Sequence, residues 1–268
     1  MKICVKDLTE TKIFGESGLS FVVEQFLTGH EVSLFVITDG EDYVILPSAQ
    51  DYKRVFEEDK GKNTGGMGAF SPAHKYCNEE VLSKVKEKII QPTLAALKKE
   101  GREYKGCLYA GLMISEDKEP YVIEFNCRFG DPEAQVVLPL LAEPLAPVLA
   151  RAAGGGPLPA ELRFSGDTAV GVVLAAGGYP GTLDTGHAID GLDRVRAECP
   201  AVDVRFAGVA ERDGMLVVSG GRVLTVVSKA PHYGDAIAAA YDAVGRIRFT
   251  GMQYRTDIGA RALAAARP

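Results

Sequence analysis

The feature that most constrains the fold is "YVIEFNCRF" (121–129), in which apolar and polar side chains alternate. Side chains of a β-strand point alternately to its two faces, so Glu124, Asn126 and Arg128 share one face. The other face carries the apolar residues Ile123, Phe125, Cys127 and Phe129. The alternation therefore predicts a strand with one face in the core and one face that carries chemistry.

The polar face of this strand offers donors that a hard cation prefers. Mg²⁺ takes oxygen ligands, usually one or two from protein and the rest from phosphate and water, and Glu124 and Asn126 suit that role. Arg128 adds planar donors for a phosphate or acyl-phosphate oxygen. Phosphoryl transfer needs this combination, because its catalysis is mostly positioning and charge neutralisation. The alternative is a solvated strand face with a Glu–Arg pair.

The segment 48–75 is long, polar and rich in glycine. This composition predicts a loop that is either functional or disordered. Within it, "GKNTGGMGAFSP" (61–72) is not a Walker A motif, because Lys62 precedes the glycines. Gly65, Gly66 and Gly68 would still let backbone N–H groups converge on an anion. Lys53 and Arg54 supply two cations just upstream. The alternative is a mobile surface loop with solvated charges.

The other periodic segments predict strands and one long helix. Apolar and β-branched runs predict strands at 21–27, 31–38, 107–115 and 121–129, with hairpin turns at 39–43 and 116–120. Asn78 is expected to cap a helix that Pro92 kinks and Gly101 ends. Together these elements predict an antiparallel sheet with a helical layer.

A second part of different character follows. Asp131 and Pro132 suggest the N-cap and first residue of a helix that runs to about Ala153. "GGGP" (154–157) reads as a linker. From about residue 163 the chain has short strands with glycine-bearing turns and one alanine-rich helix. The fold class expected is α+β, with domains at 1–155 and 163–268. Lysine is concentrated before residue 134 and arginine after it, which indicates either a domain boundary or a junction between two coding sequences.

Composition excludes several classes of function. The formal net charge of −6 and the dispersed basic residues give no surface for nucleic acid. No run of 18 apolar residues is present, so no membrane span is expected. The five cysteines form no C-x-x-C pair and the four histidines are scattered, which favours reduced thiols in the cytoplasm over a zinc site.

Several longer motifs resemble one family. These are "VVEQFLTGHEVS", "SAQDYKRV", "KNTGGMGAFSPA", "YAGLMI", "IEFNCRFGDPEAQ", "GVVLAAGGYPG", "GGRVLTV" and "YRTDIGARAL". In order and without large gaps, they resemble glycinamide ribonucleotide synthetase (phosphoribosylamine–glycine ligase), an ATP-grasp enzyme of purine synthesis. The resemblance implies a partial ATP-grasp domain over 1–155, followed by the small β-rich C-terminal domain of the synthetase.

The resemblance also implies roles for particular residues. The adenine would lie at the hinge formed by Glu24, Gln25, Phe26 and Leu27. Glu31 would bind the ribose hydroxyls, and Arg54 and Asn63 would contact the nucleotide. Glu124 and Asn126 would hold Mg²⁺, or Mn²⁺ in its place. Arg128 and Asp131 would lie near the phosphates and the substrate as catalytic residues, although a helix N-cap is the stronger explanation of Asp131.

The implied reaction joins glycine to phosphoribosylamine in two steps. Glycine's carboxylate attacks the γ-phosphorus of ATP, and the amine then attacks the glycyl phosphate. Family chains carry a further N-terminal region with phosphate-binding lysines, which this sequence does not match. Tyr52, His30 and Gln25 also differ from the family's usual residues. The alternatives are a non-catalytic portion that needs a separate N-terminal half, and another ATP-grasp carboxylate–amine ligase.

Overall fold

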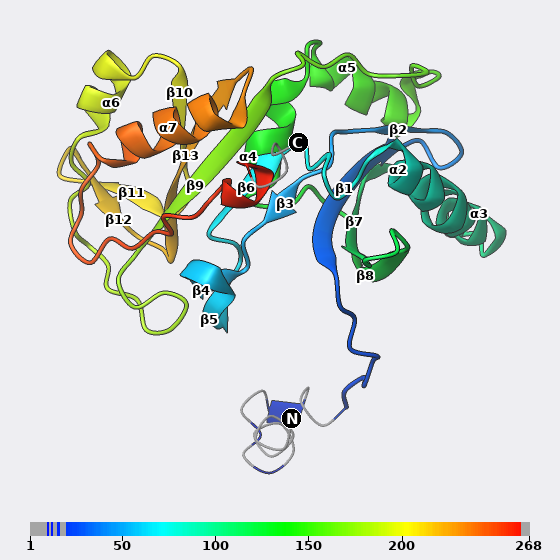
Figure 1. The fold of residues 1–268 in the computed structure, drawn as a ribbon, viewed down its shortest axis with the longest axis horizontal. Coiled ribbons are helices and arrows are strands. Elements are labelled where there is room, and N and C mark those ends of the chain that lie inside the picture. The colour runs from blue at the N-terminus through cyan, green and yellow to red at the C-terminus, as the bar shows by residue number, and fades with distance from the viewer. Residues whose placement is uncertain (1–9, 11, 13–14, 17–19, 264–268) are drawn as a thin grey trace.

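The computed structural model describes residues 10, 12, 15–16 and 20–263 of the 268-residue chain. Within these ranges the chain forms two larger antiparallel sheets that lie side by side, each with helices packed on it, and two small two-stranded sheets (Figure 1). The predicted α+β class is therefore confirmed. None of the helices in the described ranges is long and apolar enough to cross a membrane.

The first sheet has four strands in the order β2-β1-β7-β8, and all neighbours are antiparallel. The strands are β1 (His30–Thr38), β2 (Tyr43–Ile45), β7 (Gly106–Ile114) and β8 (Pro120–Asn126). Both predicted hairpins are present. Asp39 closes the first turn, because its Oδ1 accepts hydrogen bonds from the backbone amides of Glu41 and Asp42.

One face of this sheet is covered by the predicted helix, which is divided in three. Its parts are α2 (Glu79–Val85), the π-helical turn η3 (Lys86–Ile90) and α3 (Gln91–Lys99). Asn78 caps α2 by accepting a hydrogen bond of 3.0 Å from the amide of Val81. Pro92 lies in the first turn of α3, directly after the wider π-turn, and the expected kink stays a prediction. Gly101 follows with a φ of +68°, which favours glycine and ends the helix.

The second sheet has five strands in the order β10-β13-β9-β6-β3. They are β3 (Gln50–Asp51), β6 (Gly68–Ser71), β9 (Thr168–Ala175), β10 (Val202–Phe206) and β13 (Arg222–Ala230). Helix α7 (Tyr233–Val244) packs on one face, and the short helix α4 (Ala134–Val137) packs on the other against Gly171, where a Cβ would lie 3.0 Å from Val136. The sheet thus joins strands from both sides of the expected boundary, and the division into domains at 1–155 and 163–268 stays a prediction.

Smaller elements complete the described chain. An exposed hairpin consists of β4 (Arg54–Phe56), the 3-10 turn η2 (Glu57–Asp59) and β5 (Lys60–Asn63). The later elements are η4 (Leu138–Leu140), α5 (Leu145–Ala150), η5 (Arg151–Gly155), α6 (Leu192–Glu198), β11 (Val209–Arg212), β12 (Met215–Val218) and α8 (Ala260–Leu263). The prediction of a loop at 48–75 was wrong in part, because this segment contains β3, β6 and the exposed hairpin.

Two further predictions were wrong. Residues 21–27 form no strand, because none of the described strands pairs with them. The side chains of Val22 and Phe26 are 84% and 87% exposed. The helix expected from Pro132 to Ala153 is broken into α4, η4, α5 and η5. Pro139 and Pro144 lie at the breaks, because a proline cannot donate the backbone hydrogen bond that a continuous helix requires.

Candidate functional site

The polar residues predicted from β8 share a sheet face with Glu31. Residues directly opposite each other on antiparallel strands point to the same face. Ser33 pairs with Gly111, and Gly111 pairs with Glu124. Glu31 lies two residues before Ser33, and Asn126 lies two residues after Glu124, so both point to the same side. The sheet register therefore brings Glu31, Glu124 and Asn126 onto one face, which we call the site face.

Glu124 and Asn126 lie next to each other on the site face. Asn126 Nδ2 donates to Glu124 Oε1 at 3.2 Å. Gly111 leaves room for them, because a Cβ there would lie 3.2 Å from Glu124 Cγ. The pair thus offers a carboxylate and an amide group side by side, and this donor chemistry fits Mg²⁺, which needs only one or two protein ligands. Among the residues described, no group of three or more His, Cys, Asp and Glu side chains could hold a metal ion.

The opposite face of β8 is not the buried face that the alternation predicts. Phe125 is 39% exposed and Cys127 is exposed. β8 is an edge strand of the described sheet, so its apolar side chains have little to pack against. A bulge also leaves Ile123 without a paired residue, because Gly111 pairs with Glu124 while Leu112 pairs with Val122.

A cavity of about 510 Å³ lies beside the site face. Six of the residues that line it carry the argument below: Glu31, Asp51, Lys53, Arg54, Asn63 and Arg261. Three of them, Glu31, Arg54 and Asn63, are predicted nucleotide-binding residues. They come from β1 and from the two strands of the exposed hairpin, in which Arg54 pairs with Asn63. The structure therefore brings this predicted set together.

Charge in the cavity is mixed and partly buried. Lys53 Nζ lies 2.6 Å from Glu31 Oε2. The pKa of Lys53 is raised: its burial lowers the value, but the charges of Asp51, Glu31 and Glu124 outweigh that effect. Burial raises the pKa of Asp51 to about 7, together with the charges of Glu133 and Glu31 and against that of Lys53. Lys53 is thus a cation held in its charged form by the carboxylates around it.

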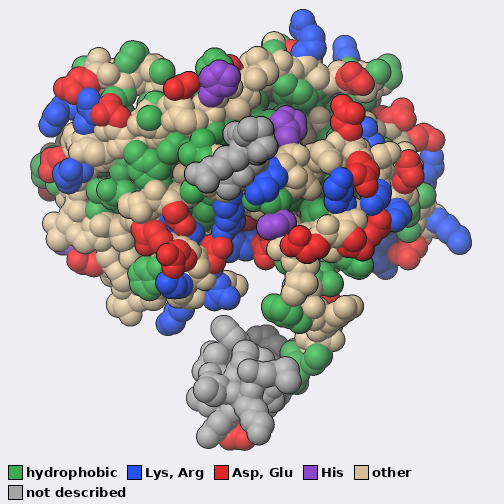
Figure 2. All heavy atoms as spheres, viewed as in Figure 1, with side chains coloured by type: hydrophobic (Ala, Val, Ile, Leu, Met, Phe, Trp, Pro, Cys, Tyr) green, Lys and Arg blue, Asp and Glu red, His purple; other side chains and the backbone are tan. Residues whose placement is uncertain are grey.

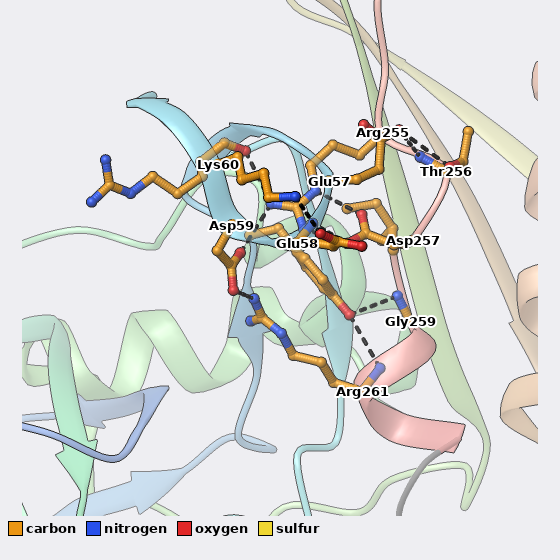
Figure 3. Close-up of polar contacts among 12 residues, drawn as sticks. Glu57, Glu58, Asp59, Lys60, Arg255, Thr256, Asp257, Gly259 and Arg261 are labelled. Carbon is orange, nitrogen blue, oxygen red and sulfur yellow. Dashed lines mark hydrogen bonds and ion pairs between the residues drawn. The ribbon is translucent and has the colours of Figure 1, made fainter.

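The exposed hairpin is held by a segment near the other end of the chain, as Figure 3 shows. Arg255 is 1% exposed, and its Nε donates to Asp257 Oδ1 at 2.7 Å. Its Nη1 also ion-pairs with Asp59 at 3.1 Å, and Arg261 pairs with the same carboxylate. Figure 2 shows the resulting mixture of acidic and basic side chains over the hairpin. These arginines were missed, although "YRTDIGARAL" was among the family motifs.

Tyr52 lies between these two arginines. The guanidinium carbons of Arg255 and Arg261 lie 4.8 and 4.1 Å from the centre of its ring, within cation–π range. Its hydroxyl accepts a hydrogen bond from the Gly259 amide at 3.0 Å. A side chain that differs from the family's usual residue is thus part of the contact between the C-terminal segment and the start of the exposed hairpin.

The glycine turn before β6 does not present free amides to an anion. The Gly65 amide donates to the Tyr179 hydroxyl at 2.9 Å, and the Gly66 amide donates to Thr64 Oγ1 at 2.9 Å. Arg222 Nη1 donates to the Gly65 carbonyl at 2.7 Å. The glycines instead allow close packing, since a Cβ on Gly66 would lie 2.4 Å from Pro132.

Asp131 and Arg128 lie beyond the end of β8. Asp131 does not cap a helix: its Oδ1 accepts from Gln135 and ion-pairs with Arg222 Nη1 at 3.1 Å. Arg222 thereby joins the glycine turn to the loop that follows the candidate metal ligands. Arg128 is exposed and donates to the Phe129 carbonyl at 2.9 Å.

The predicted hinge residues are not part of the cavity lining. Glu24, Gln25 and Phe26 are exposed, and Leu27 is partly exposed. In Figure 1 this segment runs from the start of β1 away from both sheets. Their role with adenine stays a prediction.

Comparison with known proteins supplies the family. The family model for the phosphoribosylglycinamide synthetase ATP-grasp (A) domain matches residues 2–134, and the model for its C domain matches residues 169–261. Phosphoribosylamine–glycine ligases of Synechocystis and Leptospira interrogans are 46% and 43% identical to this chain over 94% and 97% of its length. The chain spans about 60% of the length of these relatives.

Solved structures agree. The phosphoribosylamine–glycine ligase of Thermotoga maritima superimposes with a TM-score of 0.84 at 35% identity, over 96% of this chain and 63% of that one. Biotin carboxylase of Campylobacter jejuni shares the fold alone, with a TM-score of 0.65 at 15% identity over 98% of this chain and 55% of that one. By its two domain matches and its relatives, the chain belongs to the phosphoribosylglycinamide synthetase (phosphoribosylamine–glycine ligase) family.

Proposed function

We propose that this chain supplies the metal-binding strand, one wall of the nucleotide site and the C-terminal domain of an ATP-dependent ligase that joins glycine to phosphoribosylamine. One observation carries the proposal. The sheet register puts Glu31, Glu124 and Asn126 on one face, beside the cavity that Arg54 and Asn63 also line. Residues with separate proposed tasks in one reaction are therefore neighbours.

Each residue has a task that its position supports. Glu31 would accept hydrogen bonds from the ribose hydroxyls, and Arg54 and Asn63 would contact the nucleotide from the hairpin. Glu124 and Asn126 would hold Mg²⁺, which when bound neutralises charge on the phosphate oxygens. Lys53 lies close enough to Glu124 to respond to its charge, and would face the phosphate or carboxylate that reacts. Asp131 and Arg128 would lie at the substrate side.

The proposed ligase also needs a polypeptide that covers the far side of the nucleotide. Exposed apolar side chains support this partner, because such groups are normally buried. Val22, Val23 and Phe26 are 78% exposed or more. A covering segment would turn the site face into a closed cleft.

Nucleotide binding tests this proposal first. Titration calorimetry with ADP and Mg²⁺ should give saturable binding to the chain, and Glu31→Gln should weaken it because the amide cannot replace a carboxylate toward the ribose hydroxyls. Phosphate release with ATP, Mg²⁺, glycine and phosphoribosylamine then measures turnover. An absence of nucleotide binding would contradict the proposal and favour the non-catalytic alternative.

A further inference from the structure

A second cavity, which we call the β2 cavity, lies at the other edge of the first sheet from the candidate metal ligands. Its volume is about 570 Å³, within the range of small-molecule sites. Strand β2 lines it, and β2 is the edge strand opposite β8. None of the described residues lines both this cavity and the one beside the site face. The β2 cavity is therefore a separate candidate site.

The walls of the β2 cavity are mostly apolar. They come from β2 and the residues after it, from α2, from η4, and from the segment 160–167 that leads to β9. The apolar side chains that form the walls include those of Ile45, Pro47, Leu82, Leu140, Leu162 and Phe164. Apolar walls with a few polar groups are typical of sites for small organic molecules.

Lys86 supplies the β2 cavity with a cation that has no carboxylate partner. Its side chain is partly buried and lines the cavity. The lysines on either side are paired, because Lys84 and Lys88 each lie 2.7 Å from a carboxylate oxygen of Glu119. Among the described residues, no carboxylate lies within 4.0 Å of the Lys86 ammonium group. The ammonium group is therefore available to a ligand.

The helix places Lys86 on its apolar side. Leu82, one turn earlier, also lines the cavity, and Ile90, one turn later, is buried. Lys86 is also the first residue of the π-helical turn, a rare feature that often marks functional sites. A lysine on this side of the helix points to a specific role, because lysine side chains normally reach into solvent.

The other charged groups at the cavity favour a singly charged anion over a phosphate. Glu161 and His74 are exposed, and Asp167 lies 3.6 Å from Lys229. The two carboxylates would repel a doubly charged phosphate more strongly than a carboxylate. Lys86 also offers a single point charge, without the planar set of donors with which arginine binds phosphate.

An extended peptide fits the cavity less well than a compact molecule. A peptide that adds to a sheet edge gains affinity from a series of main-chain hydrogen bonds. β2 comprises only Tyr43–Ile45, so its edge offers few of these bonds. The ligand that the cavity fits is therefore a small molecule.

We propose that the β2 cavity binds a small carboxylic acid with an apolar or aromatic body. The body would pack against Leu82, Leu162 and Phe164, and the carboxylate would pair with the Lys86 ammonium group. This pair is partly removed from water, so it is stronger than an exposed ion pair. The site goes beyond the proposed function and does not depend on it.

The test uses two probes with the same apolar body and opposite charge, phenylbutyrate and phenylbutylamine. Binding is measured by calorimetry for the native chain, Lys86→Met and Lys88→Met. Methionine keeps the apolar part of the lysine side chain, and Lys88 is the exposed, paired control. The native chain and K88M should bind the acid about tenfold more tightly than the amine. K86M should bind both probes about equally.

A second variant tests the location of the site. Ala160 is exposed and lines the cavity, so Ala160→Trp should fill part of the cavity without disturbing buried packing. A160W should bind phenylbutyrate about tenfold more weakly than the native chain does. ADP with Mg²⁺ should not displace phenylbutyrate from the native chain, because the two cavities are separate.

Four results would overturn the proposal. The first is an absence of saturable phenylbutyrate binding to the native chain. The second is an unchanged preference for the acid in K86M, which would mean that Lys86 does not contact the carboxylate. The third is undiminished binding in A160W. The fourth is displacement of phenylbutyrate by ADP with Mg²⁺, which would place the acid in the nucleotide cavity.

Discussion

Nη1 of Arg255 lies 3.1 Å from Oδ1 of Asp59, although 196 residues separate them in sequence. Asp59 lies in the exposed hairpin that carries Arg54 and Asn63, and Arg255 lies in the segment that leads to α8 (Figure 3). The C-terminal part of the chain thus fixes the position of two proposed nucleotide contacts. The hairpin depends on it, because among the described strands β4 and β5 pair only with each other.

Asp59→Asn should destabilise the fold by about 1–2 kcal/mol, because it removes charge that faces a buried guanidinium while Asp257 remains. Urea denaturation measures this free energy of unfolding. Asp203→Asn, at an exposed pair, should stay within about 0.5 kcal/mol of the native chain. Equal stability of both variants would show that the hairpin does not depend on Asp59.

Asp51→Asn should stabilise the chain at high pH. The folded pKa of Asp51, about 7, lies above its ordinary value of 3.8, so the folded state holds the proton more tightly than the unfolded state. The contribution of Asp51 to stability therefore falls as pH rises from about 4 to about 7, and the loss remains above pH 7. Removing the carboxyl group should raise the free energy of unfolding at pH 8 by about 2–4 kcal/mol.

The same pH range provides the check on that prediction. Charged and titratable groups around Asp51 are Lys53, Glu31, Glu133 and Tyr109, and the D51N variant keeps all of them. The difference in stability between D51N and the native chain, measured in urea at intervals from pH 4 to pH 8, should grow and then level off. A difference that shrinks with rising pH would mean that a partner satisfies the carboxylate in solution.

Arg222→Gln should loosen the glycine turn. The arginine donates to the Gly65 and Asp131 carbonyls at 2.7 Å each and pairs with the Asp131 carboxylate. Loss of these charged hydrogen bonds should speed amide hydrogen exchange in a peptide spanning 61–70 about tenfold. Arg205→Gln, at an exposed arginine of the same sheet, should leave this exchange unchanged. If amide hydrogen exchange at 61–70 is unchanged in R222Q, then Arg222 does not hold the glycine turn to the loop that contains Asp131.

The helix at 78–101 could be predicted from sequence, because its determinants are local. Asn78 caps it and Gly101 ends it, and both act on backbone groups within a few residues. The shared face of Glu124 and Asn126 also follows from local alternation. The bulge at Ile123 does not, since it depends on the register with β7.

Long-range contacts explain what sequence reasoning missed. The run at 21–27 has strand-forming residues, but a strand needs a partner, and none of the described strands provides one. The glycine turn has the composition of an anion cradle, yet Tyr179 and Arg222 occupy its polar groups from more than 100 residues away. Arg255 and Arg261 act on the site only because the fold brings the C-terminal segment against the exposed hairpin at 54–63.

The most direct test of the central claim is the effect of Mg²⁺ on ADP affinity in the native chain and in Glu124→Gln. The glutamine keeps the shape of the side chain but removes the charge that would hold the metal. We predict that Mg²⁺ strengthens ADP binding to the native chain at least tenfold, and that E124Q binds ADP equally with and without Mg²⁺. An undiminished Mg²⁺ effect in E124Q would contradict the assignment of the site face as the metal and nucleotide site.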